Sequence, residues 1–287
     1  DFDLEKRGIL HFYHSEYDYQ VATGVNYLLC SGGLIRHAVT PEEITKIEPS
    51  LTGDYYGGFY CPDDATGDIH KFTTGLAKVT EKYGVKYLFG MEVVNVEHSS
   101  NGVSIQYHPS IDNTHGESVA IETLQADAVL VCGGVGSYQL ANQLGDRVNV
   151  YPVKGYSITV QLNDEKSVQG APWVSLLDES AKIVTSRLGA DRLRIAGTAE
   201  FNGYNRDIRS DRIEPLIGWV NKNFDISTEH CVPWAGLRPM MPNMMPVVKR
   251  GKRERVFYNT GHGHLGWTLS AATAVMISQE IASSHPI

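Results

Sequence analysis

The sequence predicts a mixed α/β protein in which a nucleotide-binding type of domain is interleaved with a domain built on an antiparallel or mixed sheet. Two strand-like apolar runs, at 126–137 and 255–268, pass directly into glycine-rich turns. Strands of open α/β sheets end in this way where a ligand lies beyond their carboxyl ends. Between the two runs, residues 151–197 alternate strand-like stretches with turn formers, which is typical of an antiparallel meander.

Composition and charge favour a globular protein with a small-molecule ligand. The chain has 287 residues, 42% of them apolar, enough to bury a core in one large or two smaller domains. A net charge of -8 argues against nucleic acid as a partner. The four cysteines lie far apart without a Cys-x-x-Cys pair, so we expect neither a disulfide framework nor a zinc site.

The sequence has no apolar run long enough to span a membrane and no signal-peptide pattern. A cytoplasmic protein is therefore expected, with peripheral attachment to the inner membrane as an open alternative. Since the first residue is Asp1, not an initiator methionine, we interpret the chain as beginning inside a longer protein.

Cap and turn residues outline the elements of the first half. Thr40-Pro41-Glu42-Glu43 is a capping box with proline in the first turn, which predicts a helix that ends near Pro49. The same signals predict a strand at 8–13, a helix at 17–31 closed by two glycines, a helix at 69–82, and strands at 85–96 and 103–107 joined by an Asn-Gly turn. A loop rich in Ser, Asn, His and Gly follows.

The second half is expected to hold most of the antiparallel sheet. Its strands are predicted at 156–162, 172–177, 182–186 and 192–197. An amphipathic helix is predicted at 207–223, with Ile208, Ile213, Leu216, Ile217 and Val220 as its apolar face. A final strand at 255–258 leads through the glycine stretch into a helix at 269–283.

The stretch 259–268, Asn-Thr-Gly-His-Gly-His-Leu-Gly-Trp-Thr, combines little side-chain bulk with the start of a helix. A ligand with electron-rich oxygens could approach this backbone and meet the first helical amides. A glycine turn ahead of a core helix is the structural alternative. The Gly-Gly-x-Gly turn that follows Cys132 leaves the same two interpretations open.

Arg238 is placed by the sequence between Leu237 and Pro239, close to Trp234 and Met240, and therefore in apolar surroundings. A guanidinium there needs an anion, which could be a substrate carboxylate or an internal Asp or Glu. Lys154 and Lys182 could face a pocket or be partly exposed sheet residues. His262 and His264 lack further ligands at metal-site spacing, and no Gly-x-Ser-x-Gly elbow indicates a hydrolase.

Four motifs together give the chain a family resemblance. They are 62–68 (Pro-Asp-Asp-Ala-Thr-Gly-Asp), 151–157 (Tyr-Pro-Val-Lys-Gly-Tyr-Ser), 234–240 (Trp-Ala-Gly-Leu-Arg-Pro-Met) and the glycine stretch 259–268. In this order they resemble the bacterial D-amino acid dehydrogenases, small subunit, which belong with glycine oxidase and D-amino acid oxidase to the FAD-dependent amine oxidoreductases. The resemblance implies oxidation of a D-amino acid to an imino acid, which water converts to a 2-oxo acid.

The resemblance also implies roles for particular residues. Arg238 would bind the substrate carboxylate, and Lys182 and His264 complete the predicted substrate-binding set. Predicted FAD contacts are Val93, Cys132, Gly133, Gly134, Gly261, His262, Gly263, His264, Leu265, Gly266 and Thr268. The amino terminus of the last helix would stabilise negative charge on the reduced flavin. Because the family transfers a hydride from the α-carbon to flavin N5, we assign no catalytic acid or base.

The FAD domain would comprise 55–146 and 251–287, and the substrate domain 1–54 and 147–250. Two departures from the family pattern affect these expectations. Residues 240–246 (Met-Met-Pro-Asn-Met-Met-Pro) replace the usual Thr-Pro-Asp-Gly-x-Pro, which would make the pocket more apolar. The family's amino-terminal Gly-x-Gly-x-x-Gly segment, which holds the FAD pyrophosphate, is not in this sequence. The FAD domain is therefore expected to be incomplete at its amino terminus, with the segment supplied from elsewhere or by a second chain.

Three functions consequently remain in view. The first is a D-amino acid dehydrogenase that passes electrons to a quinone or another acceptor. The second is an oxidase for glycine, sarcosine or another secondary amine. The third, motivated by the absent pyrophosphate segment, is a catalytically silent fragment or partner subunit that does not bind FAD tightly.

Overall fold

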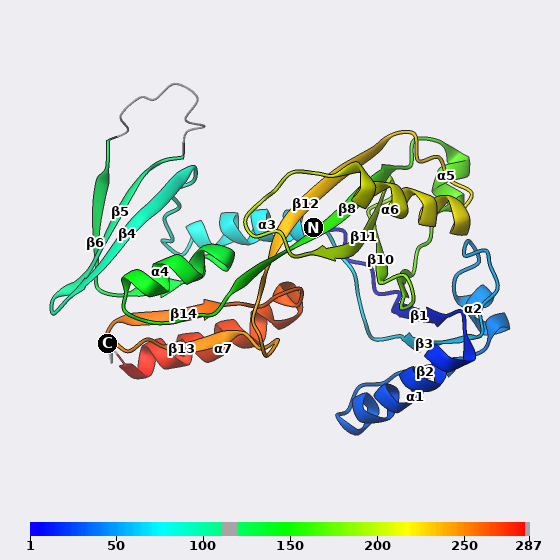
Figure 1. The fold of residues 1–287 in the computed structure, drawn as a ribbon, viewed down its shortest axis with the longest axis horizontal. Helices are drawn as coiled ribbons and strands as arrows, with labels where there is room; N and C mark the ends of the chain where they lie inside the picture. Colours follow the sequence, from blue (N-terminus) through cyan, green and yellow to red (C-terminus); the bar gives the residue numbers. More distant parts are fainter. Residues whose placement is uncertain (111–119, 285–287) are drawn as a thin grey trace. The chain divides into compact units, whose positions relative to one another are not determined.

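The computed structural model describes residues 1–110 and 120–284, which form two compact units (Figure 1). Unit 1 comprises Asp1–Gly84, Lys154–Glu200 and Arg206–Gly236, and unit 2 comprises Val85–Val153, Phe201–Asn205 and Leu237–Ile287. The chain therefore passes several times between the units, with boundaries near Gly84, Val153 and Gly236. None of the helices described is both long and apolar enough to span a membrane.

Unit 1 is organised around an eight-stranded sheet with the strand order β12-β8-β11-β10-β9-β1-β3-β2. Its strands are β1 (Ile9–Tyr13), β2 (His37–Val39), β3 (Gly57–Cys61), β8 (Tyr151–Gln161), β9 (Ser175–Asp178), β10 (Ile183–Leu188), β11 (Arg192–Glu200) and β12 (Cys231–Met240). The first residues of β8, to Val153, and the last of β12, from Leu237, belong to unit 2. Strands β8 to β11 pair antiparallel, whereas β1 pairs parallel with β9 and joins the early and late segments of the chain. The sheet is therefore mixed.

Five helices accompany this sheet, and their caps follow from the sequence. They are α1 (Glu16–Ser31), α2 (Pro41–Ile47), α3 (Ile69–Glu81), α5 (Glu165–Gly170) and α6 (Ser210–Asn223). The capping box of α2 is present as predicted, with both the Thr40 and Glu43 side chains bonded to backbone amides. Helix α6 buries Leu216 and Val220 in a core that also contains Ile195 of the sheet.

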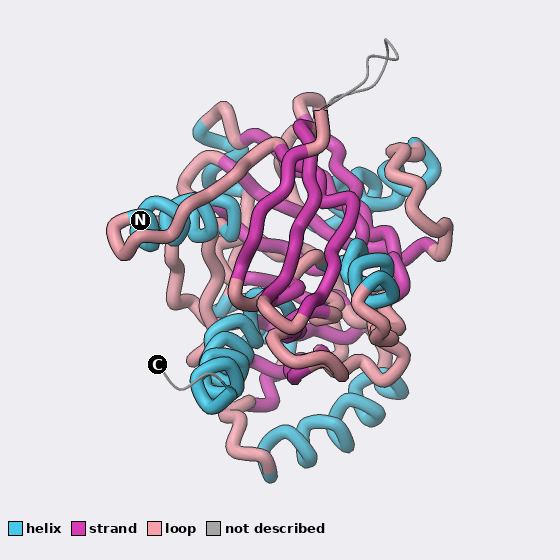
Figure 2. Tube along the Cα trace, turned by 90° about the vertical axis from the view of Figure 1, so that its left-hand side faces the viewer, coloured by secondary structure: helices cyan, strands magenta, loops and turns pink. Residues whose placement is uncertain are grey.

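The described residues of unit 2 form two three-stranded sheets. The first has the order β13-β14-β7, from β7 (Val129–Val131), β13 (Val247–Arg250) and β14 (Val256–Thr260). The second is an antiparallel meander of β4 (Met91–Ser99), β5 (Gly102–Pro109) and β6 (Glu122–Ala126), whose strands lie side by side in Figure 2. The helices of the unit are η1 (Gly134–Gly136), α4 (Ser137–Gln143) and α7 (Gly266–Ser284).

Most predicted elements are present, and the errors have physical causes. The Asn101-Gly102 hairpin is confirmed, but β4 begins only at Met91, because positive φ at Gly90 interrupts the apolar run. The strand predicted to be buried on both faces is the short β7, and its Leu130 is exposed. Ile208 also lies outside α6 and is exposed. Strand β6 and helix α5 were not predicted, and the predicted polar loop lies partly outside the described residues.

Lys154 was predicted to face a pocket or be partly exposed, and both interpretations are wrong. Its side chain is fully buried, and its Nζ lies 3.0 Å from a carboxylate oxygen of Glu200 on the neighbouring strand β11. Tyr156 donates to the same carboxylate at 2.5 Å and Arg209 at 2.9 Å. Lys154 Nζ also donates to the carbonyl oxygen of Asp207 at 3.1 Å. Because a carboxylate and a carbonyl oxygen accept from it, the burial of this lysine is compensated. The cluster links β8, β11 and the segment before α6.

We expect this cluster to make folding stability depend on pH. Hydrogen bonds from Tyr156 and Lys154 lower the pKa of Glu200 from 4.5 to about 2. A lowered folded-state pKa contributes stability above the ordinary value, and the contribution is lost as pH falls from 4.5 toward about 2. Urea unfolding of the wild type and Glu200→Gln should therefore differ most near neutral pH and converge below pH 4.5. A double variant, Lys154→Met with Glu200→Leu, should recover much of the lost stability. A constant difference across pH would contradict this account.

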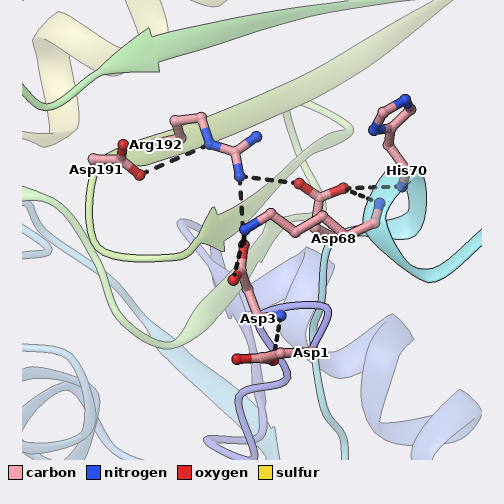
Figure 3. Close-up of polar contacts among 7 residues, drawn as sticks. Asp1, Asp3, Asp68, His70, Asp191 and Arg192 are labelled. Carbon is pink, nitrogen blue, oxygen red and sulfur yellow. Dashed lines mark hydrogen bonds and ion pairs between the residues drawn. The ribbon is translucent and has the colours of Figure 1, made fainter. Parts of the chain in front are cut away.

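Asp68 connects the 62–68 motif to the sheet of unit 1 (Figure 3). One carboxylate oxygen caps α3 by accepting from the amides of His70 and Lys71, and the other lies 3.0 Å from Arg192 of β11. Burial alone raises the pKa of Asp68. The amide of Lys71 and the Arg192 guanidinium lower it by more, so the pKa of Asp68 is below its ordinary value. One side chain thus fixes both the start of a helix and its attachment to a strand.

Substitutions of Asp68 should separate these two contacts. Asp68→Asn keeps an oxygen for the cap but loses the charge opposite Arg192, whereas Asp68→Ala loses both. Loss of the cap alone costs about 1 kcal/mol. Asp68→Ala should therefore be less stable than Asp68→Asn by roughly that amount in chemical unfolding. Equal stability of the two variants would show that the cap contributes nothing measurable.

Candidate functional site

Two glycine turns meet at one edge of a sheet in unit 2. Strands β7 and β14 pair in parallel, with Val131 opposite Tyr258, so their carboxyl ends face the same edge. β7 runs into Cys132 and Gly133, and β14 runs into Gly261. The prediction that both strands open onto a glycine turn is confirmed, and the pairing makes the two turns neighbours. This is the position at which open α/β sheets bind ligands.

A buried pair of hydroxyl groups holds the two turns together. Ser137, the first residue of α4, lies with its Oγ 2.7 Å from Oγ1 of Thr260, at the end of β14. The Thr260 hydroxyl is also within 3.4 Å of the carbonyl oxygen of Gly134. Both side chains are almost fully buried. No local sequence pattern marks this pair, although each residue lies directly beside a glycine motif.

The loop after β14 needs glycine at two positions. Gly261 and Gly263 both adopt positive φ, of 78° and 58°, which side-chain-bearing residues rarely do. A Cβ on Gly261 would lie 2.7 Å from Met241, and one on Gly263 would lie 2.8 Å from the sulfur of Met240. The loop backbone is therefore packed directly against the first two residues of the methionine-rich segment.

His262 and His264 have different environments within this loop. His262 is partly buried with its Nε2 3.2 Å from the Thr273 hydroxyl, and burial lowers the pKa of its imidazole. It therefore remains neutral to lower pH than an exposed histidine. His264 is exposed, as are Leu265 and Thr268, while Gly266 begins α7. The side that carries these residues can be reached by a ligand.

Arg238 is joined to the same loop through its neighbour in β12. The amide of Gly263 donates to the carbonyl oxygen of Pro239 at 3.0 Å. The guanidinium of Arg238 is half-buried, and burial lowers its pKa, although it stays charged at physiological pH. A cation on the strand that holds the loop is thus fixed within the same unit as both glycine turns.

Val93 lies in the other sheet of unit 2 and is tied to these turns by α4. The pairing of β4 with β5 is irregular between Val93 and Asn95. Gln143 at the end of α4 fills this irregularity, donating to the Val94 carbonyl at 2.9 Å and accepting from the Val96 amide at 3.1 Å. The helix that starts at the first glycine turn therefore ends on the strand that contains Val93.

Lys182 alone among the predicted site residues belongs to unit 1. It lies in the turn before β10 with φ of 55°, and its Nζ is 3.0 Å from Glu179. A hydrogen bond from His11 lowers the pKa of Glu179, and the Lys182 cation lowers it as well. Together they outweigh burial, which raises it, and bring the pKa to about 2. The lysine charge is thus already compensated within its own unit.

The residues of unit 2 fit a large, electron-rich cofactor. The turn at Cys132–Gly134 leaves backbone uncovered, and Gly134 would place a Cβ in open space. Helix α7 adds the partial positive charge of its first-turn amides. Within the described residues no group of three or more His, Cys, Asp or Glu side chains could hold a metal ion. The donors available are amides and a guanidinium, which suit anionic and carbonyl oxygens.

Comparison with known proteins gives consistent matches over nearly the whole chain. The family model described as FAD dependent oxidoreductase matches residues 1–280. The chain is 53% identical to a D-amino acid dehydrogenase 3 of Mesorhizobium japonicum, over 100% of this chain and 68% of the relative. It is 37% identical to a D-amino acid dehydrogenase of Dechloromonas aromatica, over 99% of this chain and 67% of the relative. The chain thus spans about two thirds of the length of these curated relatives.

Solved structures share the fold at low sequence identity. A glycine oxidase from Geobacillus kaustophilus superposes with a TM-score of 0.83 at 19% identity, covering 99% of this chain and 73% of that one. An L-proline dehydrogenase from P. horikoshii gives a TM-score of 0.80 at 15% identity, covering 98% and 74%. The family match over residues 1–280, with which the two neighbouring glycine turns agree, shows that this chain belongs to the FAD-dependent oxidoreductase family.

Proposed function

We propose that this chain forms the larger part of an FAD-dependent D-amino acid dehydrogenase. The observation that carries the proposal is the connection between the loop at Gly261–Gly263 and the strand of Arg238, made by the hydrogen bond from the Gly263 amide to Pro239. It fixes a carboxylate-binding cation relative to the loop expected to border the flavin. The names of the related proteins support D-amino acids as the substrate class.

In this proposal unit 2 holds the cofactor. Val93 would contact the adenine end, Cys132, Gly133 and Gly134 would pass close to its phosphate and ribose region, and the loop from Gly261 to Thr268 would border the flavin ring. FAD, when bound, supplies the hydride acceptor for oxidation of the α-carbon. The amino terminus of α7 would stabilise negative charge at the adjacent oxygens. The role of Lys182, which lies in unit 1, in substrate binding stays a prediction.

The chain's own residues would act mainly by positioning. Arg238 would pair with the substrate carboxylate in two parallel hydrogen bonds and fix the α-carbon, and His264 would contact the substrate from the exposed side of the loop. Met240 and Met241, packed on the loop, would keep water from the reacting carbon. No side chain is assigned as a general base, since the ammonium proton of the substrate would pass to water. Loss of the α-hydride from the neutral amine then gives an iminium ion, which water hydrolyses to a 2-oxo acid and ammonium.

The electron acceptor in this proposal is a quinone or another carrier, and the protein would contact the inner membrane from its cytoplasmic side. The pyrophosphate-binding segment would come from an additional amino-terminal stretch or a second chain. Anaerobic reduction by D-alanine, followed by reoxidation with a soluble quinone, tests the acceptor directly. Reoxidation by oxygen alone would contradict it.

An amine oxidase is the second candidate, favoured by the structural likeness to glycine oxidase. The third candidate, a silent subunit, predicts that the purified chain does not take up flavin. The absorbance spectrum of the chain after incubation with FAD, together with its intact mass, tests the third. Bleaching of bound flavin by D-alanine supports the dehydrogenase, and bleaching by sarcosine alone supports the amine oxidase.

Gly134→Ala should weaken FAD binding by at least about tenfold, because a methyl group would occupy the space left open at the turn after β7. Gly84→Ala is the matched control. Gly84 also has positive φ and no neighbour within 4 Å of its Cβ position, but it follows α3 in unit 1. Both variants place alanine at positive φ, so a difference in FAD affinity, measured by titration of FAD fluorescence, reflects where each residue lies. Equal losses in both would contradict the assignment of Gly134.

Arg238→Met should raise the D-amino acid concentration needed for half-maximal flavin bleaching by roughly a hundredfold, equivalent to about 3 kcal/mol. The methionine keeps an apolar stem but cannot pair with a carboxylate. FAD affinity should change little. Arg250→Met, at an exposed position of β13 in the same unit, should leave both quantities unchanged. If FAD affinity falls as steeply as substrate affinity, Arg238 has a structural role.

A further inference from the structure

Unit 1 contains a pocket of about 390 Å³ that none of the functional assignments above explains, apart from Lys182 on its wall. It lies against β1 and α1, beside the turn between β9 and β10. Its polar wall includes Tyr13, Arg36, Asp18, Glu179 and Lys182. Every one of these residues belongs to unit 1, so the pocket is defined within a single compact unit.

Arg36 provides the first charge without a counter-charge. Its side chain is 8% exposed, and its guanidinium lies over the ring of Phe59 at 4.8 Å from the ring centre. One terminal nitrogen donates to the Tyr13 hydroxyl at 3.4 Å, and Nε has no acceptor. In the part of the chain that the structure describes, no carboxylate comes within 4.0 Å of this guanidinium. A buried cation in this state favours an anionic ligand.

Tyr13 adds a neutral donor beside Arg36. Because its oxygen accepts from the guanidinium, its own proton is available for a second hydrogen bond. Burial, and then the nearby Glu179 carboxylate, raise the pKa of Tyr13, so the hydroxyl stays protonated. A guanidinium next to a phenolic hydroxyl is well matched to the two oxygens of a carboxylate.

Asp18 supplies the complementary negative charge. Its carboxylate accepts from the Ser15 hydroxyl at 2.7 Å and from the Ser180 hydroxyl at 3.3 Å, both of which are neutral groups. Within the described residues it forms no ion pair, whereas the neighbouring Glu179 is already paired with Lys182 at 3.0 Å. The pocket thus presents one cation and one anion that do not pair with each other.

The third wall of the pocket is apolar. Val21, Ala22 and Val25 line it from one face of α1, at the spacing that brings successive helical turns together. A ligand that reaches both charges would place any side chain against this face. The three walls therefore specify a carboxylate, an ammonium and an apolar group on one small molecule.

We propose that this pocket binds an α-amino acid as a zwitterion. The carboxylate would pair with Arg36 and the Tyr13 hydroxyl, the ammonium would face Asp18, and an aliphatic side chain would lie on Val21 and Val25. Binding here needs no flavin, so it does not depend on the function proposed above. If that function holds, the pocket takes compounds of the same class as the substrate.

Calorimetric titration of the flavin-free chain with D-leucine and L-leucine tests the proposal. At least one enantiomer should bind saturably. 4-Methylpentanoate lacks the ammonium and 3-methylbutan-1-amine lacks the carboxylate, so each should bind at least about tenfold more weakly. Absence of saturable leucine binding to the wild type, or equal affinity for either single-charge analogue, would overturn it.

Variants locate the binding. Arg36→Met should weaken leucine binding at least about tenfold, with thermal unfolding recorded to confirm that the variant folds. Val25→Trp should fill the pocket from the half-exposed side of α1 and abolish binding, and Leu28→Trp, at an exposed position of the same helix outside the pocket, should not. Unchanged binding in Val25→Trp would overturn the assignment. Arg238→Met should still bind leucine. If Arg238→Met lost leucine binding while Val25→Trp kept it, leucine would bind at the proposed substrate site and not in this pocket.

Discussion

The parallel pairing of β7 with β14 is the constraint on which the arrangement of unit 2 depends. It brings the carboxyl ends of two strands, separated by more than a hundred residues of sequence, to the same edge. The buried Ser137–Thr260 contact then sets the spacing between the turns. The hydrogen bond from the Gly263 amide to Pro239 attaches the loop after β14 to β12. A change in the register of this one pair would displace both turns, α4 and, through Gln143, the irregular part of β4.

The charged side chains of unit 1 discussed above fall into two groups, those with an ion-pair partner inside the protein and those without one. The exposed fraction of a side chain does not tell to which group it belongs. Lys154 and Glu200 are buried and mutually compensated, and the buried Asp68 is compensated by the partly exposed Arg192. Both pairs join strands to neighbouring segments. Arg36 and Asp18 face one pocket without forming an ion pair in the described structure. Compensation inside the protein indicates a structural role, and its absence beside a cavity indicates a ligand.

The sequence predicted well what depends on neighbours along the chain. The capping box at Thr40, the Asn101-Gly102 turn and the two strand-to-glycine transitions are all present, because caps and turns are decided by a few adjacent residues. It could not predict that Lys154 is fully buried, because its counter-charge, Glu200, lies on another strand distant in the sequence. The pocket at Arg36 could not be predicted either, because residues distant in the sequence form it. Its lining comes from two segments over 140 residues apart, and no local motif marks Arg36 or Asp18.

The parallel contact between β1 and β9 has a consequence for how the chain folds. Ile9 lies opposite Ser175, so the middle of the eight-stranded sheet closes only after the intervening chain has been synthesised. Contacts this distant in sequence carry a large loop-closure entropy and slow the search for the native state. Until then β1 leaves one sheet edge unpaired, and a nascent chain with such an edge is open to chaperones and to association with other copies.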